Sequence, residues 1–135
     1  MKSLKAIAAG CIFIVVAGLL LQLAYIFFAV IHVYLAKSYP LLNDIGIYFK
    51  YLIGFPVFFL LMFAGGYVTA DFAPENIIRN CLLVAMITMS LSMLSALSYS
   101  EITITGLIVL FVALIATVAG GLYWRYATLN SEIIK

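Results

Sequence analysis

Four long hydrophobic runs without charged residues divide the sequence, and short charged clusters separate them. About 20 residues of helix cross a hydrocarbon core of roughly 30 Å, and each run reaches that length. A segment inside lipid must also satisfy its own backbone hydrogen bonds, as a helix does. The pattern therefore predicts an all-α integral membrane protein, a four-transmembrane-helix bundle that forms a single domain. The expected spans are approximately residues 6–36, 51–70, 76–98 and 102–125.

Proline residues mark the expected ends of these helices. The first helix should end at Ser38-Tyr39-Pro40, because the residue before a proline avoids helical geometry, and a loop from Pro40 to Gly46 should follow. The second helix is expected to start between Ile47 and Leu52, which places Pro56 in its first or second turn. Pro74 suits the first position of the third helix.

The first run is longer than one crossing requires, so its helix is expected to tilt or to project beyond the membrane. A cleaved signal peptide is the alternative for this run. However, its apolar stretch greatly exceeds the roughly 7–15 residues of a signal, and no Ala-x-Ala-like cleavage site follows it. We therefore expect a permanent helix.

Composition and charge agree with lipid as the solvent. Hydrophobic residues make up 67% of the 135 residues and charged residues 9%, against about half and about a quarter in soluble domains. A net charge of +2 is too small and too dispersed for nucleic-acid binding. Basic residues predict the orientation, because they gather on the cytoplasmic side. With both termini cytoplasmic (N-in/C-in), Lys2, Lys5, Arg79, Arg125 and Lys135 lie inside, and Lys37 and Lys50 lie outside.

The second and fourth runs each end with the same three small residues. Ala64-Gly65-Gly66 and Ala119-Gly120-Gly121 are 55 residues apart. This spacing suggests a 2+2 parallel hairpin repeat, although coincidence stays open because Gly and Ala are common in such helices. In either case small residues allow helix backbones to approach closely.

The stretch Gly65-Gly66-Tyr67-Val68-Thr69-Ala70 resembles one in many small, uncharacterised bacterial four-helix membrane proteins. In those proteins a Gly-Gly-Tyr-x-Ala/Thr-Ala motif closes the second helix. Here Asp71 stands where a basic residue is common in them. The resemblance covers about ten residues, and it implies a bacterial cell (inner) membrane location without indicating an activity.

Helical spacing places small and polar residues on one face of three of the expected helices. The simplest interpretation is a bundle with these faces inward, where polar groups hydrogen-bond helix to helix. Gln22 lies nearest the middle of the membrane, and contact with a passing substrate is the alternative role for it. The residues expected at helix contacts are Gly18, Gln22, Gly65, Gly66, Thr88, Ser92, Ser95, Gly120 and Gly121.

Little in the sequence points to chemistry. A structural zinc site needs about four ligands, and the two cysteines, Cys11 and Cys81, with the single histidine cannot supply them. We therefore expect no metal, and we also expect no catalytic residue and no cofactor. One polar group of residues is expected at the outer face, formed by His32, Tyr39, Asp44 and Glu101. A proton-linked or ligand-contacting His32 is the alternative to a simple interfacial role. An intramembrane enzyme is a further alternative, since these four residues could in principle meet at the outer face, but their spacing selects no reaction.

The sequence favours a non-enzymatic structural or accessory membrane subunit that acts by helix–helix contacts. Its expected partners are the lipid bilayer and either a second copy or a larger membrane protein, but not nucleic acid. The alternative is a small transporter or channel component, which would need an oligomer because one chain of this length encloses little space.

Overall fold

The computed structural model describes residues 2–39, 42–99 and 104–133, and its regular structure there is entirely helical. Each of the four α-helices contains a stretch that is long and apolar enough to cross a membrane, which confirms the four apolar helices expected from the sequence. The elements in chain order are α1 (Lys2–Ala36), α2 (Leu42–Phe72), the short 3-10 helix η1 (Pro74–Asn76), α3 (Ile77–Tyr99) and α4 (Ile104–Ile133).

The start of α2 corrects the sequence prediction. The helix begins at Leu42, so the expected loop is wrong over residues 42–46, and Pro56 lies well inside the helix rather than near its start. Charged residues limit where an apolar span begins, but they do not stop a helix, whose backbone bonds are internal. Within α2, Ile53–Phe72 is long and apolar enough to cross a membrane, and it covers most of the expected span 51–70.

The turn between α2 and α3 forms as its proline predicts. Pro74 occupies the start of η1, where its missing N–H costs nothing, and Glu75 adds an acidic group to the first turn. Before it, the Ala73 N–H donates to the Thr69 carbonyl oxygen at 3.3 Å, which closes the end of α2. The chain therefore reverses within a few residues.

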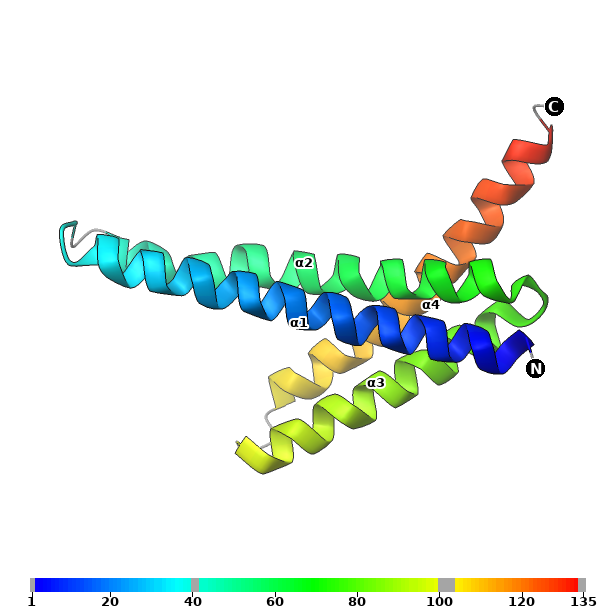
Figure 1. Ribbon diagram of the computed structural model, residues 1–135, viewed down its shortest axis with the longest axis horizontal. Coiled ribbons are helices and arrows are strands. Elements are labelled where there is room, and N and C mark those ends of the chain that lie inside the picture. Colours follow the sequence, from blue (N-terminus) through cyan, green and yellow to red (C-terminus); the bar gives the residue numbers. More distant parts are fainter. Residues whose placement is uncertain (1, 40–41, 100–103, 134–135) are drawn as a thin grey trace.

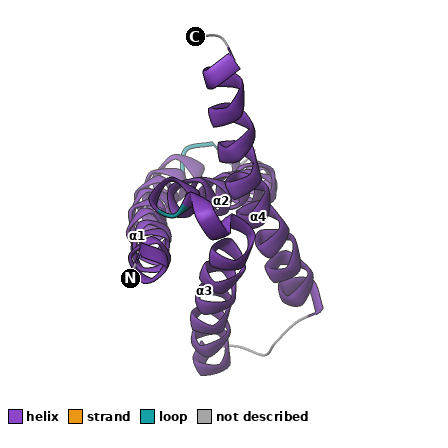
Figure 2. Cartoon of the chain, turned by 90° about the vertical axis from the view of Figure 1, so that its right-hand side faces the viewer, coloured by secondary structure: helices purple, strands orange, loops and turns teal. Residues whose placement is uncertain are grey.

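The helices form two antiparallel hairpins, α1–α2 and α3–α4, which cross at one end of the molecule and separate toward the other (Figure 1). The view in Figure 2 shows α3 and the start of α4 leaning away from the α1–α2 pair. We call the region around the start of α1 and the α2–α3 turn the packed end, and the opposite region the open end. In α1 the buried residues are Ala6, Gly10 and Ile14, all in its first half.

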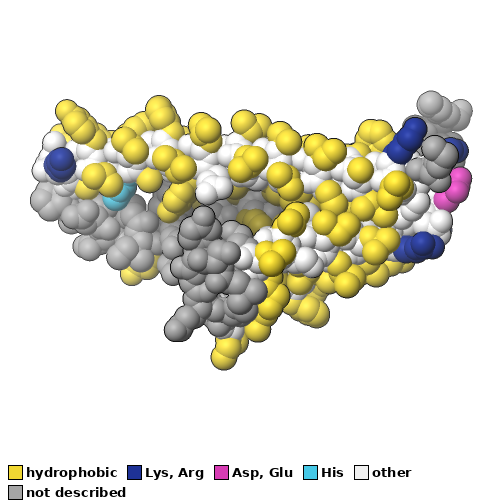
Figure 3. Space-filling model, turned by 60° about the horizontal axis from the view of Figure 1, so that its bottom comes forward, with side chains coloured by type: hydrophobic (Ala, Val, Ile, Leu, Met, Phe, Trp, Pro, Cys, Tyr) yellow, Lys and Arg dark blue, Asp and Glu magenta, His cyan; other side chains and the backbone are white. Residues whose placement is uncertain are grey.

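The core lies at the packed end and is small. One cluster joins Ile14 of α1, Met62 of α2, Val84 of α3 and Ala113 of α4, so that each helix contributes one buried side chain. A second cluster around Cys81 lies nearer the α2–α3 turn. In Figure 3 the visible charged side chains gather at the two ends of the molecule, and apolar surface covers the length between them.

Candidate functional site

The closest approach between helices is the crossing of α2 and α4. A Cβ atom on Gly66 would overlap the carbonyl oxygen of Thr117, and one on Gly120 would overlap the carbonyl oxygen of Phe63. Both glycines are buried. Backbone therefore lies directly against backbone here, a contact that small residues permit and any side chain would block.

The neighbouring glycines of each pair face the other two helices. A Cβ atom on Gly65 would overlap the side chain of Ile14 in α1, and one on Gly121 would lie 2.5 Å from Cys81 Sγ in α3. The two Ala-Gly-Gly segments thus join all four helices at the packed end. The 55-residue spacing makes Gly120 the counterpart of Gly65 in the proposed repeat. Gly65 faces α1 whereas Gly120 faces α2, so the two counterparts make different contacts. The 2+2 repeat therefore stays a prediction.

Buried threonines in α2, α3 and α4 satisfy their hydroxyl groups within their own helices. Thr69 Oγ1 donates to the Gly65 carbonyl oxygen at 2.8 Å, Thr88 Oγ1 to that of Val84 at 2.9 Å, and Thr117 Oγ1 to that of Ala113 at 2.9 Å. A threonine whose hydroxyl group donates to its own helix needs no hydrogen-bond partner on a neighbouring helix. Thr88 therefore packs at the helix contact without the interhelical hydrogen bond that its position suggests.

Polar side chains also link helices at the packed end, and the sequence interpretation missed the following two links. Ser3 Oγ donates to Asn80 Oδ1, which joins α1 to α3, and Trp124 Nε1 donates to Asp71 Oδ1 at 3.0 Å, which joins α4 to α2. Trp124 lies 53 positions from Asp71 in the sequence, and no local pattern indicates this pair.

Gly10 was missed as well, because it lies off the small-residue stripe of the first helix. A Cβ atom on Gly10 would overlap Thr69 Oγ1 and would come within 3.2 Å of Val84 Cγ2. The residue thus lets α1 contact α2 and α3 together. A signal was available, because Ala6 and Gly10 stand four residues apart, a spacing of small residues typical of helix contacts, and both are buried.

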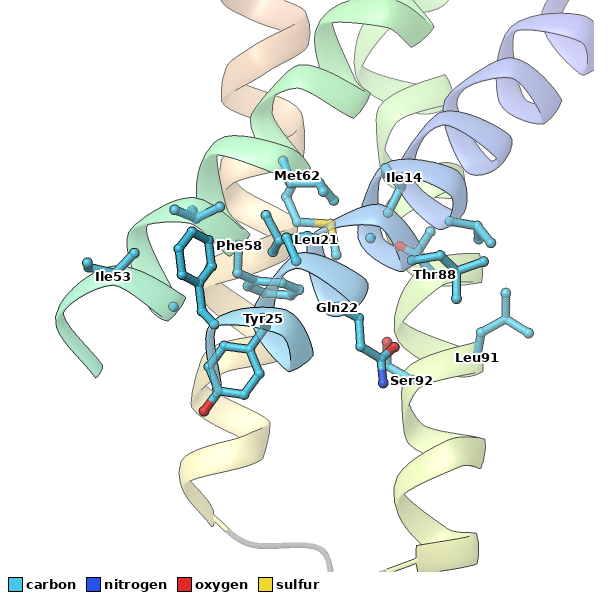
Figure 4. A pocket seen from close by; sticks show the side chains of 18 residues that line it. Ile14, Leu21, Gln22, Tyr25, Ile53, Phe58, Met62, Thr88, Leu91 and Ser92 are labelled. Atoms are coloured by element: carbon cyan, nitrogen blue, oxygen red, sulfur yellow. The ribbon is translucent and has the colours of Figure 1, made fainter. Parts of the chain in front are cut away.

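A cavity of about 840 Å³ opens where the hairpins separate, and we call it the groove. Its walls come from α1, α2 and α3 and are mainly aliphatic and aromatic, with Phe58, Met62 and Leu91 among them (Figure 4). Gly18 and Gly54 line it too, and a Cβ atom on either would have no neighbour within 4 Å. The groove is therefore open space beside α1 rather than a packed contact.

Polar groups in the groove come from two facing helices. Figure 4 shows Gln22 of α1 extending toward Ser92 of α3, with Thr88 one turn away. Gln22 is exposed, and among the described residues no hydrogen bond satisfies its amide. Within the chain, Gly18, Gln22 and Ser92 thus do not pack helix to helix as expected, because the hairpins have already separated at their level. The Ser95 side chain lies outside the described part of the structure.

The expected outer-face residues cannot be assembled into one site from the described side chains. Tyr39 is 63% exposed beyond the end of α1, where its N–H donates to the Leu35 carbonyl oxygen at 3.0 Å. His32 is half-buried near the same end. The side chains of Asp44 and Glu101 lie outside the described residues.

The arrangement is suited to binding an apolar partner. Within the described side chains, no three His, Cys, Asp or Glu groups lie close enough to hold a metal ion. The groove offers apolar walls and a few hydrogen-bonding groups, the usual composition of a binding pocket of this size. Comparison with protein-family models, curated proteins and solved structures gave no match, so the function is argued from these residues alone.

Proposed function

We propose that this chain is a non-enzymatic accessory protein of the bacterial cell membrane, which acts by helix–helix contacts made in the groove. The observation that carries the proposal is how little of the apolar helix α1 is buried. Its most apolar stretch is the most apolar of the four candidate spans, yet only 6% of that stretch is buried, against 22–33% in the others. A helix that is apolar all round needs lipid or protein around it.

The same proposal includes an orientation of the chain across the membrane. Both termini lie in the cytoplasm, so the packed end is cytoplasmic and the groove widens toward the outer leaflet. Support comes from the basic residues, five of which then lie inside and two outside, as the positive-inside rule requires. Tyr123, Trp124 and Tyr126 surround Arg125 near the packed end and form an interfacial anchor of the usual kind.

Reporter fusions test this orientation directly. Fusions after residues 43, 73, 100 and 135 are expected to report outside, inside, outside and inside in turn, because each helix crosses once. An extracellular C-terminus would contradict the proposal. Each fusion protein is expected to be extracted from the membrane without having been cleaved.

Co-purification tests whether the groove is the contact surface. A tagged chain is expected to bring down an untagged second copy or a defined membrane partner from native-lipid nanodiscs. Gly18→Leu should abolish this, because leucine fills the groove without meeting atoms near its Cβ. The matched control is Leu23→Phe, on the face of α1 away from the groove, where Leu23 is 70% exposed. Equal recovery of partner by both variants would count against the groove.

The second candidate is a transporter or channel component that works as an oligomer. The facing Gln22 and Ser92 favour it, since a substrate path needs polar groups at depth. The apolar remainder of the groove favours the accessory role instead. A solute flux into proteoliposomes that Gln22→Leu abolishes, while the variant stays folded, would decide for transport.

A further inference from the structure

We propose that a second copy of this chain occupies the groove, with the two α1 helices crossing at Gly18 and the two Gln22 amides hydrogen-bonded to each other. The inference rests on the proposed membrane location and names the partner of the proposed contact. Three features of the structure support it: the open space beside α1, the unsatisfied amide within it, and the bulky residues on the opposite face of the helix.

Membrane insertion restricts how two copies can meet. Every copy has the same orientation across the bilayer, so the symmetry axis of a dimer is perpendicular to the membrane plane. The two α1 helices then run parallel, and each residue lies at the same depth as its counterpart. A groove residue near the axis therefore meets its own copy.

Gln22 is the residue suited to such a contact. Its amide offers both donors and an acceptor, so two glutamines related by symmetry can hydrogen-bond to each other. No hydrogen bond among the described residues satisfies it within one chain. Polar side chains of this kind hydrogen-bond between helices in membranes.

The space around Gly18 supplies the close approach that the contact needs. Gly18 lies one turn from Gln22 on the same face, and both residues line the groove. Nothing lies within 4 Å of a Cβ atom built on Gly18, so a second helix can approach the backbone there. Ile14, the next residue of this face toward the packed end, is already buried against Gly65. The contact between the two α1 helices therefore ends before Ile14 on that side.

The opposite face of α1 presents bulky side chains and no polar group at this depth. Leu20, Leu23 and Phe27 are 62–70% exposed and do not line the groove. This face is suited to lipid tails. A lipid tail in the groove would instead supply no hydrogen-bond partner to Gln22, because hydrocarbon has neither donors nor acceptors. The groove therefore favours a second copy over lipid.

Disulfide cross-linking tests the position of the contact while Gln22 is kept. Gly18→Cys is expected to give a covalent dimer in native membranes treated with copper phenanthroline, because symmetry brings the two thiols together. Leu20→Cys, two residues away on the other face, is the matched control and should stay monomeric. The wild-type chain gives the baseline, since Cys81 is buried and Cys11 half-buried.

The amide is tested in the same background. Adding Gln22→Leu to Gly18→Cys should weaken dimerisation about 3- to 30-fold, the worth of one interhelical hydrogen bond, whereas Gln22→Asn should retain most of it. Equal cross-linking at residues 18 and 20, or none at 18, overturns the inference. If Gly18→Cys cross-links only to a different protein, the second copy is wrong and the accessory role stands. If native mass spectrometry finds a monomer carrying a lipid, both the second-copy inference and the accessory role fail.

Discussion

Glycines determine how closely the helices meet, and the two Ala-Gly-Gly segments supply four of them. Gly66 and Gly120 bring the backbones of α2 and α4 into contact, while Gly65 and Gly121 admit side chains from α1 and α3. The threonines beside them are compatible with this packing, because their hydroxyl groups bond to their own helices. Small residues are thus concentrated where four helices must share little space.

Gly66→Ala is expected to lower the free energy of unfolding by about 1–3 kcal/mol, because the added methyl group overlaps backbone atoms that cannot move aside. Gly54→Ala in the same helix is the control. It has open space around its Cβ and should raise stability by roughly 0.5–1 kcal/mol through helix propensity. Thermal unfolding in detergent measures both. Equal destabilisation by the two variants would show that the α2–α4 contact is looser than described.

The sequence predicted these glycines as packing residues, since the paired Ala-Gly-Gly segments are visible without a structure. It could not predict their partners, because a small residue is compatible with any neighbour. The same limit applied to Gln22, whose depth was readable from the charge pattern while its position in an open groove was not. Asn80, fully buried beside Ser3, had no local pattern to mark it.

At the scale of helices, α2 and α4 are joined twice, by the glycine crossing and by the Asp71–Trp124 hydrogen bond. The sequence located the apolar stretch of each helix well, because charge and hydrophobicity decide which residues enter lipid. It located helix ends less well. The first turns of α2 contain charged residues and still form a helix, since helical hydrogen bonding continues outside the hydrocarbon.

Asp71→Ala is expected to change the fluorescence of Trp124, the single tryptophan of the chain, because the indole N–H loses its acceptor. The emission maximum should shift, and stability should fall by about 0.5–1.5 kcal/mol, the net worth of one hydrogen bond. Glu75→Ala removes an exposed carboxylate at the same end and serves as the control. An identical spectrum for wild type and Asp71→Ala would refute the link between α2 and α4.

At the scale of the whole molecule, tight packing at one end contrasts with separation at the other. The packed end joins all four helices through small residues, whereas the open end leaves α1 largely unburied and the groove unfilled. Residue patterns along single helices could not reveal this contrast, because the crossing of the two hairpins depends on contacts between distant segments. The groove follows from that crossing.

The proposal that this protein acts by helix–helix contacts is tested most directly by the mass of the wild-type chain in native-lipid nanodiscs. Native mass spectrometry, which resolves protein from bound lipid, makes the measurement, with the Gly18→Leu variant as the comparison. The account predicts two chains per particle for the wild type and one for the variant. A wild-type particle that holds a single chain and no other protein would contradict it.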